Sequence, residues 1–270
     1  MLQVRLLTGI RRLYRGTLRN LMSAIHYSSA SLLQLHHRVH VLVDFDGTIV
    51  PDDATDSLLD RFADPAWRAI EAAWQAGVIS SRECLSRQVD LLRATPRELD
   101  AAIRSVEIDP GFPGFLNFCQ SNDIEVTIVS DGFDRVVRSV LERAQLPIRF
   151  FANKLSWQGS DRWRLEFPFS RSDCRSSGAN CKCSHRTFGH GRHVVVGDGR
   201  SDFCMALHAD YVICKGTLKH FCRDNRVHHA SFDTFADVPE RLEEWLIGFR
   251  HVAAEISPPD AGHAQRERFA

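Results

Sequence analysis

The chain has 270 residues, 44% of them hydrophobic, and its 34 basic and 34 acidic residues leave no net formal charge at pH 7. This length allows a sizeable hydrophobic core, and the balanced charge gives no electrostatic case for nucleic-acid binding. No stretch is long and apolar enough to predict a membrane span. Eight cysteines without a secretory signal pattern favour a reducing, cytoplasmic location.

The N-terminal region differs from the rest, because residues 1–43 contain no Asp or Glu but several Arg. We expect residues 1–38 to form a basic, disordered extension. Two other interpretations stay open, a mitochondrial transit peptide and a helix lying on an anionic surface. Met22 is an alternative start.

The first apolar run, residues 39–43, leads directly into Asp44-Phe45-Asp46-Gly47-Thr48. It predicts a buried parallel strand, whose carboxyl end opens into the crevice where α/β proteins bind ligands. Asp44 and Asp46 are expected to point the same way, because side chains alternate along a strand. Two carboxylates in one small site either raise a pKa or hold a cation.

The next segment, residues 52–110, is much longer than an ordinary connection and carries helix signals. N-cap, capping-box and proline patterns predict helix starts at Asp64-Pro65, near Ser80 and at Thr95-Pro96. We therefore expect an inserted helical bundle over residues 52–110, and at this place in the chain it resembles the cap of phosphoserine-phosphatase-like enzymes. Such a cap would close over a site, exclude water and select the substrate.

Two later apolar runs also end in polar motifs. Residues 124–129 precede Ser130-Asp131-Gly132, where a hydroxyl and consecutive backbone amides entering a helix suit an anion. Residues 193–196 precede Gly197-Asp198-Gly199-Arg200-Ser201-Asp202. Carboxylates from separate strand ends are the hard oxygen ligands that Mg²⁺ prefers. Three strand ends thus predict a nucleophile or ligand pair, a phosphate cradle and a metal site.

In this order, and with a lysine between the last two, these motifs resemble the haloacid dehalogenase superfamily of phosphohydrolases, over roughly residues 39–246. The resemblance implies an α/β fold with a doubly wound, mainly parallel Rossmann-like sheet. Its core would comprise residues 39–51 and 111–247, and we expect a flexible tail at residues 248–270.

The resemblance also implies an aspartyl-phosphate mechanism. Asp44 would be the nucleophile, and Asp46 the general acid and then the general base. Mg²⁺ would be held by Asp44, the backbone carbonyl of Asp46 and Asp198, while Asp202 would orient these groups or ligate directly.

Phosphate would be bound by Ser130, Asp131, Gly132 and a lysine. Lys182 is favoured for this role, because it precedes a possible helix leading to the last of these strands. Lys154 is the rival, in a segment that predicts a β-hairpin.

The substrate is less defined by the sequence. Asp53 lies where phosphoserine phosphatases of this superfamily carry a substrate-contacting acid, and it is either such a contact or a solvated loop carboxylate. The cysteine-rich segment 174–183 resembles the methionine-salvage phosphatases that act on 2-hydroxy-3-keto-5-methylthiopentenyl-1-phosphate. The arginines that could bind the carboxylate of phosphoserine are not ranked by the sequence: Arg82, Arg87, Arg93 and Arg97.

We therefore expect Mg²⁺-dependent hydrolysis of a small phosphorylated metabolite, with no nucleic-acid or membrane partner. The substrate would be a methionine-salvage-type enol phosphate or phosphoserine. An inactive binding or regulatory module on the same fold is the alternative from another class. The oligomeric state is not predicted.

Three cysteines of this segment raise a separate question. Cys174, Cys181 and Cys183 would suit Zn²⁺ with His185 as the fourth ligand, since thiolates and imidazole are its usual ligands. Reduced thiols in a surface loop are the competing interpretation, because the Cys-x-Cys spacing is unusual for a zinc site. A disulfide is the third.

Overall fold

A computed structural model describes residues 38–174, 178–188 and 191–256. Its sheet has seven strands in the order β4-β3-β2-β1-β5-β6-β7. All neighbouring strands run parallel except β3 and β4. The strands are β1 (Val39–Val43), β2 (Glu125–Phe133), β3 (Arg149–Trp157), β4 (Trp163–Glu166), β5 (Arg192–Gly197), β6 (Tyr211–Cys214) and β7 (His229–Ser231).

Helices follow most of the strands. The α-helices are α2 (Ala54–Phe62), α3 (Trp67–Gln75), α4 (Ser81–Leu91), α5 (Pro96–Ile103), α6 (Phe112–Ser121), α7 (Asp134–Arg143), α8 (Phe203–Ala206), α9 (Gly216–Asp224) and α10 (Val238–Ile256). Two 3₁₀ helices, η1 (Lys182–Phe188) and η2 (Arg200–Asp202), precede β5 and α8. None of the described helices is both long and apolar enough to cross a membrane.

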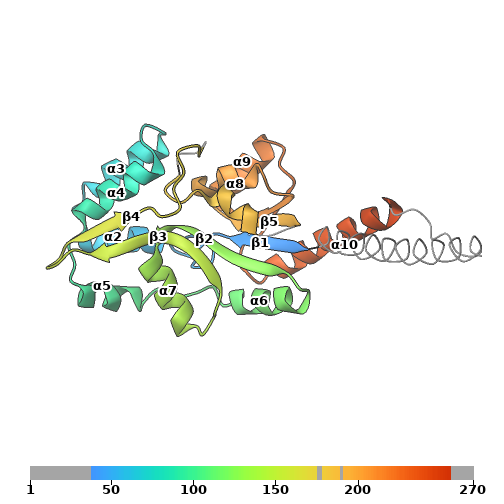
Figure 1. Cartoon of the computed structure of the whole chain (residues 1–270), viewed down its shortest axis with the longest axis horizontal. Helices are drawn as coiled ribbons and strands as arrows, with labels where there is room; N and C mark the ends of the chain where they lie inside the picture. Colours follow the sequence, from blue (N-terminus) through green and yellow to red (C-terminus); the bar gives the residue numbers. More distant parts are fainter. Residues whose placement is uncertain (1–37, 175–177, 189–190, 257–270) are drawn as a thin grey trace, which may run out of the picture.

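Both faces of the sheet are covered, so the predicted doubly wound, mainly parallel α/β fold is confirmed. Figure 1 shows α6 and α7 on one side of the strands and α8 and α9 on the other. In β1, Val41 packs into the core on the first side and Leu42 into the core on the second. This alternation is the reason that β1 is buried along its whole length and is apolar except for His40.

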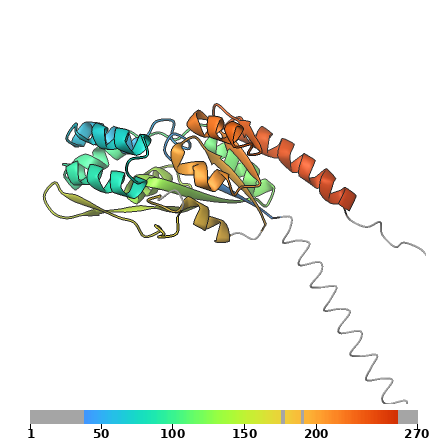
Figure 2. The same cartoon turned by 90° about the horizontal axis from the view of Figure 1, so that it is seen from above.

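Five helices lie between β1 and β2, and the first four of them, α2–α5, gather at one end of the sheet (Figure 2). Two predicted helix starts are confirmed in detail. The hydroxyl of Ser80 accepts a hydrogen bond from the N–H of Glu83. Thr95 and Glu98 form a complete capping box, with Pro96 in the first turn. The third helix, α3, begins at Trp67, two residues after the predicted start at Pro65.

Three further expectations can be compared with the fold. The predicted hairpin is confirmed as the antiparallel pair β3–β4. The possible helix that the sequence placed after Lys182 is the 3₁₀ helix η1, which begins at Lys182 itself and leads to β5. The last helix continues to Ile256, past residue 247, where we expected the core to end and a flexible tail to begin. The predicted N-terminal extension lies outside the described residues, except for Arg38.

Candidate active site

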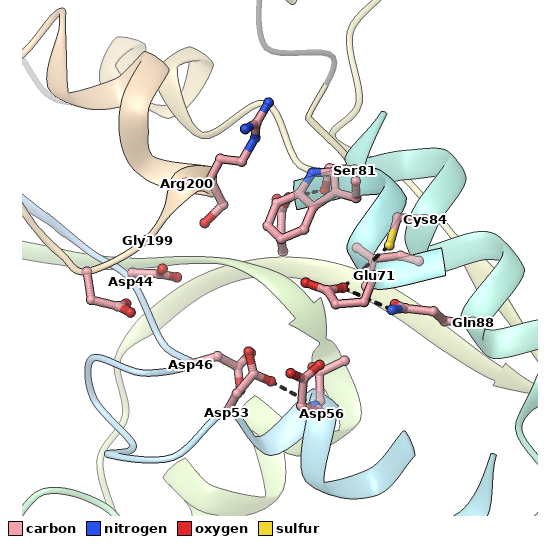
Figure 3. Close-up of a pocket in the computed structure, with 16 residues that line it drawn as sticks. Asp44, Asp46, Asp53, Asp56, Glu71, Ser81, Cys84, Gln88, Gly199 and Arg200 are labelled. Carbon is pink, nitrogen blue, oxygen red and sulfur yellow. Dashed lines mark hydrogen bonds between the residues drawn. The ribbon is translucent and has the colours of Figure 1, made fainter. Parts of the chain in front are cut away.

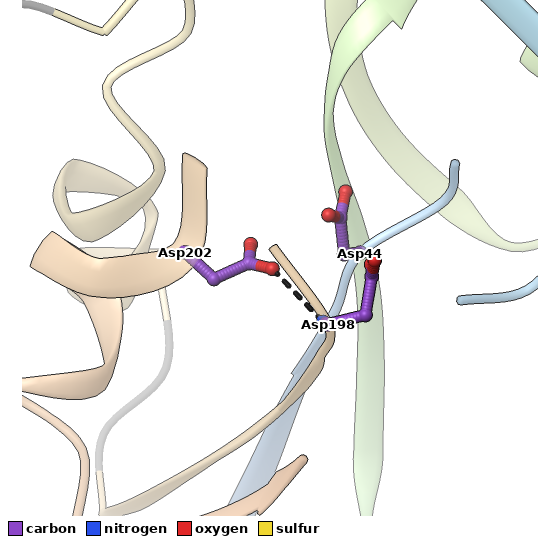
Figure 4. A group of neighbouring side chains, drawn as sticks. All are labelled: Asp44, Asp198 and Asp202. Carbon is purple, nitrogen blue, oxygen red and sulfur yellow. Dashed lines mark hydrogen bonds between the residues drawn. The ribbon is translucent and has the colours of Figure 1, made fainter. Parts of the chain in front are cut away.

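The central strands β1 and β5 end side by side and deliver carboxylates to the same place. The backbone N–H of Asp44 donates a hydrogen bond to the carbonyl of Val196 at 2.9 Å, so the two strands are still paired at their carboxyl ends. Asp44, Asp198 and Asp202 each offer a carboxylate oxygen, and these oxygens lie within 4.8 Å of one another (Figure 4). Asp44 is far in sequence from Asp198 and Asp202, and the parallel pairing of β1 with β5 brings it beside them.

Lys182 is the cation of this group. Its Nζ lies 2.7 Å from Oδ1 of Asp44 and 2.8 Å from Oδ1 of Asp202. The lysine side chain is only 2% exposed, so both ion pairs are shielded from water. The rival Lys154 lies on the hairpin, where its exposed side chain pairs with Glu166. Lys182 therefore has the location that a phosphate-binding lysine requires, and Lys154 does not.

Asp198 is held by residues of the first motif. Thr48 donates its hydroxyl hydrogen to Oδ1 of Asp198 at 2.8 Å, and Thr48 is completely buried. Gly47 has a φ of +68°, and a Cβ at this position would meet Oδ2 of Asp198 at 2.6 Å. Glycine is therefore needed here both for the left-handed backbone and for the close approach of the carboxylate.

Asp202 is completely buried and is held through both carboxylate oxygens. Oδ1 accepts the hydrogen bond from Lys182, and Oδ2 lies 3.3 Å from the backbone nitrogens of Asp198 and Gly199. Its carboxylate thus connects the lysine to the loop that carries Asp198. The sequence left two roles open for Asp202, orienting the neighbouring groups or ligating Mg²⁺ directly. These hydrogen bonds favour the orienting role.

The end of β2 supplies the third part of the site. Ser130 is fully buried, and its Oγ accepts a hydrogen bond from the N–H of Gly132 at 2.8 Å. A Cβ on Gly132 would meet Oδ2 of Asp46 at 2.3 Å, so a side chain here would displace that carboxylate. The hydroxyl of Thr55 lies in the same place, is buried, and has no hydrogen-bond partner within the described parts of the chain.

Asp131 has a contact that the sequence did not predict. Its Oδ2 accepts a hydrogen bond from the hydroxyl of Ser81 in α4 at 2.6 Å. Its Oδ1 accepts from the backbone N–H of Asn180 at 3.0 Å. The Asp131 carboxylate therefore ties the helical segment to the sheet, and phosphate binding by this residue stays a prediction.

A cavity of about 140 Å³ lies beside these carboxylates, between the carboxyl ends of the strands and the helices α2–α4 (Figure 3). Seven of the sixteen residues that line the cavity are acidic, and Arg200 is the basic residue among them. The lining includes Asp44, Asp46, Asp53, Thr55, Asp56, Glu71, Trp74, Ser81, Gln88, Asp198 and Arg200. Asp53, the predicted substrate residue, caps α2 by accepting a hydrogen bond from the N–H of Asp56.

Arg200 lines the cavity, although the sequence analysis assigned only the acids of its motif to the site. Its Nη1 donates to the backbone carbonyl of Gln75 at the C-terminal end of α3, at 3.1 Å. Arg82, Arg87, Arg93 and Arg97, which the sequence offered for a substrate carboxylate, are not among the residues that line the cavity. No local sequence signal distinguishes Arg200, since its contact lies 125 positions away in the chain.

Burial and mutual repulsion shift the pKa values of these acids upward. Burial raises the pKa of Asp44 well above its ordinary value, and the nearby Asp202 raises it further. The same causes raise the pKa of Asp198 to about 6. The pKa of Asp46 is also raised well above its ordinary value, by burial and then by Asp53. For Lys182, burial alone would lower the pKa, but Asp202 and Asp44 more than reverse this and raise it.

The acids at the two strand ends fit a divalent cation. Lys182 supplies one positive charge to a group of three carboxylates, so negative charge remains uncompensated. The donors are carboxylate oxygens without sulfur or imidazole, which is the donor set of Mg²⁺. A bound cation would relieve the repulsion that raises the pKa values of Asp44 and Asp198.

Sequence relatives match about three quarters of the chain. A 2-hydroxy-3-keto-5-methylthiopentenyl-1-phosphate phosphatase from Geobacillus kaustophilus is 32% identical over 210 residues, which cover 76% of this chain and 95% of the relative. The bifunctional enzyme MtnB/MtnX from Bacillus licheniformis is 30% identical over 210 residues, with 76% of this chain and 49% of that protein covered.

Solved structures support the same fold. A phosphoserine phosphatase with a phospho-aspartyl intermediate analogue has a TM-score of 0.59 and 22% identity, covering 77% of this chain and 98% of that one. A haloacid dehalogenase family hydrolase from Salmonella enterica also has a TM-score of 0.59, at 17% identity, covering 74% of this chain and 69% of that one. The haloacid dehalogenase-like hydrolase family matches residues 41–207. The chain therefore belongs to this family.

Proposed function

We propose that this protein is a Mg²⁺-dependent phosphatase that hydrolyses a small phosphomonoester through an aspartyl-phosphate on Asp44. The observation that carries the proposal is the contact of Lys182 with both Asp44 and Asp202, with Asp198 beside them at the ends of β1 and β5. The relatives, several of them phosphatases of phosphorylated metabolites by name, support a phosphoric monoester hydrolase.

In the proposed first step, a carboxylate oxygen of Asp44 attacks phosphorus, and the bond from phosphorus to the ester oxygen breaks. Lys182 holds the nucleophile and would face the phosphoryl oxygens, so its charge stabilises the transferring group. The buried hydroxyl of Ser130 and the backbone N–H groups around it would donate hydrogen bonds to the remaining phosphoryl oxygens.

Asp46 would donate a proton to the leaving oxygen and later remove one from the attacking water. Its raised pKa supports this assignment, because burial and the neighbouring Asp53 favour the protonated carboxyl that a general acid needs. The carboxylate lies against Gly132 and accepts a hydrogen bond from the N–H of Ala54 at 3.0 Å. It is therefore oriented by the start of α2, beside the cavity.

Mg²⁺ would be held by Asp44, Asp198 and the backbone carbonyl of Asp46. When bound, the ion would neutralise part of the negative charge on the phosphoryl group. Thr48 and Gly47 would fix the carboxylate of Asp198 for this role. Asp202 would act mainly by orienting Lys182 and the Asp198 loop.

The helical segment α2–α5 would act as the cap of this site, over the proposed range 52–110. Its helices contribute Asp56, Glu71, Trp74 and Gln88 to the cavity wall, and two contacts join it to the core across the cavity. These contacts are Ser81 to Asp131 and Arg200 to Gln75. A cap fastened at these points would exclude water and select the leaving group.

The relatives' printed substrate makes 2-hydroxy-3-keto-5-methylthiopentenyl-1-phosphate the first candidate substrate. Phosphoserine is the second, because the cavity combines carboxylates that suit an amine with Arg200, which suits a carboxylate. Asp53 and Glu71 would then bind the amine.

The test is phosphate release from a panel of small phosphomonoesters that includes both candidates, with Mg²⁺ and with a chelator. Asp44→Asn should lower the rate by at least about 10³-fold, because it removes the nucleophile. The chelator should abolish the wild-type rate, and added Mg²⁺ should restore it. Asp52→Asn, the same change at an exposed neighbour, is the matched control and should keep the wild-type rate.

Substantial activity in folded Asp44→Asn would rule out the aspartyl-phosphate on this residue. The ranking of the two candidate esters by kcat/KM decides between the proposed substrates. No release from any ester would favour an acceptor other than water, or an inactive binding module on this fold.

A further inference from the structure

Four of the eight cysteines lie together behind the site, around the segment that carries Lys182. The Sγ atoms of Cys181 and Cys183 are 3.6 Å apart, and those of Cys183 and Cys204 are 3.4 Å apart. The thiol of Cys174 is hydrogen-bonded to that of Cys181 at the other end. The sulfurs therefore form a continuous row, which we call the thiol row.

Cys204 is the member that the sequence did not predict. It lies in α8, 21 positions after Cys183, and reaches the thiol row because α8 packs against η1. His185, expected as the fourth ligand, is turned away from this role. Its ring stacks on Phe151 with centroids 4.2 Å apart, and its Nε2 is hydrogen-bonded to Oδ1 of Asn180 at 2.7 Å.

The distances fit ligands of one metal ion better than a disulfide. Sulfurs that share a tetrahedral Zn²⁺ at about 2.3 Å lie about 3.8 Å from each other, whereas bonded sulfurs are about 2.05 Å apart. Within the described ranges, the site aspartates are the one group whose ligand atoms already lie within 4.8 Å of one another. Binding would therefore require the end members of the thiol row, Cys174 and Cys204, to turn inward by a change of rotamer.

The surroundings are compatible with a bound ion. Cys181 is buried, and the other three sulfurs belong to partly buried residues, so water has limited access. Burial, and then the neighbouring thiols, raise the pKa of Cys183, which leaves an unreactive thiol in the absence of metal. The guanidinium of Arg171 is close enough to Cys181 and Cys183 to interact with them electrostatically.

We propose that Cys174, Cys181, Cys183 and Cys204 bind one Zn²⁺ ion as a structural site. On binding, the four thiols release four protons to solvent, and four thiolates with one Zn²⁺ carry a net charge of −2. Arg171 offsets part of this charge. The proposal does not rest on the phosphatase function, since the thiol row contributes nothing to the reaction.

The proposed ion would join two segments that carry site residues. Cys181 and Cys183 flank Lys182, and Cys204 follows Asp202 by two positions. A metal between them would hold η1 against α8 and so maintain the buried ion pair between Lys182 and Asp202. Because structural zinc contributes directly to folding, the ion would also stabilise this half of the core.

The experiment measures metal content by mass spectrometry in the full chain, purified without chelator and reloaded with Zn²⁺ under reducing conditions. The expected result is about one zinc per wild-type chain. Cys183→Ser and Cys204→Ser should each lower this content at least fivefold. Cys119→Ser, at a buried cysteine of α6 outside the thiol row, is the matched control and should keep it.

Two measurements keep the test independent of variants that fail to fold. Cys174→Ser alters the outermost member of the thiol row, which is not fully buried. Replacing zinc by Co²⁺ in the wild type should produce the visible absorption of a tetrahedral thiolate site. Less than about 0.1 zinc per folded wild-type chain, or unchanged zinc in Cys204→Ser, would overturn the proposal. So would two missing thiols on titration of the denatured protein, which would assign a disulfide instead.

Discussion

Among single residues, Lys182 depends strongly on its neighbours, because its ammonium group is buried between two carboxylates. A fully buried ammonium is tolerated only with close partners, and here two carboxylates lie within 2.8 Å of it. Thr48 and Gly47 have a similar supporting role for Asp198. These residues explain why the first motif continues through Gly-Thr after its two acids.

We expect Lys182→Ala to abolish phosphate release and to destabilise the fold by about 3–5 kcal/mol, because it leaves two buried carboxylates without their cation. Lys154→Ala should change neither quantity appreciably, since that lysine is exposed. Steady-state kinetics and urea unfolding of both variants measure this. The reverse order of effects would transfer the phosphate role to Lys154.

At the scale of elements, the site depends on contacts between the helical segment and the core. Ser81 in α4 reaches Asp131 at the end of β2, and Arg200 in η2 reaches the last turn of α3. A cation is favoured at a helix C-terminus, because the last carbonyl groups there lack intrahelical partners. Both contacts cross the cavity, so they would set how firmly the helices close over a substrate.

We expect Arg200→Ala to raise KM for the preferred ester roughly tenfold, the equivalent of about 1.4 kcal/mol. The reason is that the change removes the basic residue of the cavity wall and its contact with Gln75. The effect on kcat should be smaller, because Arg200 is not assigned to the reacting atoms. Arg87→Ala, at an exposed arginine of α4 paired with Glu83, is the control. An unchanged KM would show that this contact does not matter for binding.

For the whole molecule, the cavity gathers acids whose pKa values are raised in the folded state. Stability should therefore fall as the pH rises and these acids lose their protons. Burial and then Asp53 raise the pKa of Asp56 to about 7, against about 3.9 in an unfolded chain. Between these pH values the folded state keeps a proton that the unfolded state has lost. The contribution of Asp56 to stability is therefore greatest at low pH and is lost as the pH rises through about 7.

Asp56→Asn should remove this dependence, since an amide does not titrate. The free energy of unfolding of the variant, minus that of the wild type, should increase between pH 5 and pH 8. Urea unfolding in metal-free buffer at several pH values measures this difference, and histidine titrations cancel in it. Asp52→Asn, at an exposed position nearby, is the control. A difference that stays constant with pH would contradict the assigned environment of Asp56.

Much of the fold and part of the site followed from local patterns. The apolar runs before Asp44, Ser130 and Asp198 predicted buried strands, because strands covered on both faces need apolar side chains in both directions. Thr95 and Glu98 predicted a helix start, because a capping box is satisfied by neighbours in the chain. α10 runs through Gly248 to Ile256, past the predicted core boundary at residue 247, because one glycine inside a helix costs only about 1 kcal/mol relative to alanine and need not end it.

Local sequence alone indicates which chemistry the strand ends carry, because acids and glycine follow each apolar run within a few positions, with serine after two of the runs. Which distant groups join them depends on tertiary packing. Lys182 rather than Lys154 meets Asp44, Arg200 reaches α3, and Cys204 completes the thiol row. Each of these contacts depends on how loops and short helices pack across the sheet, and local periodicity contains no information on such packing.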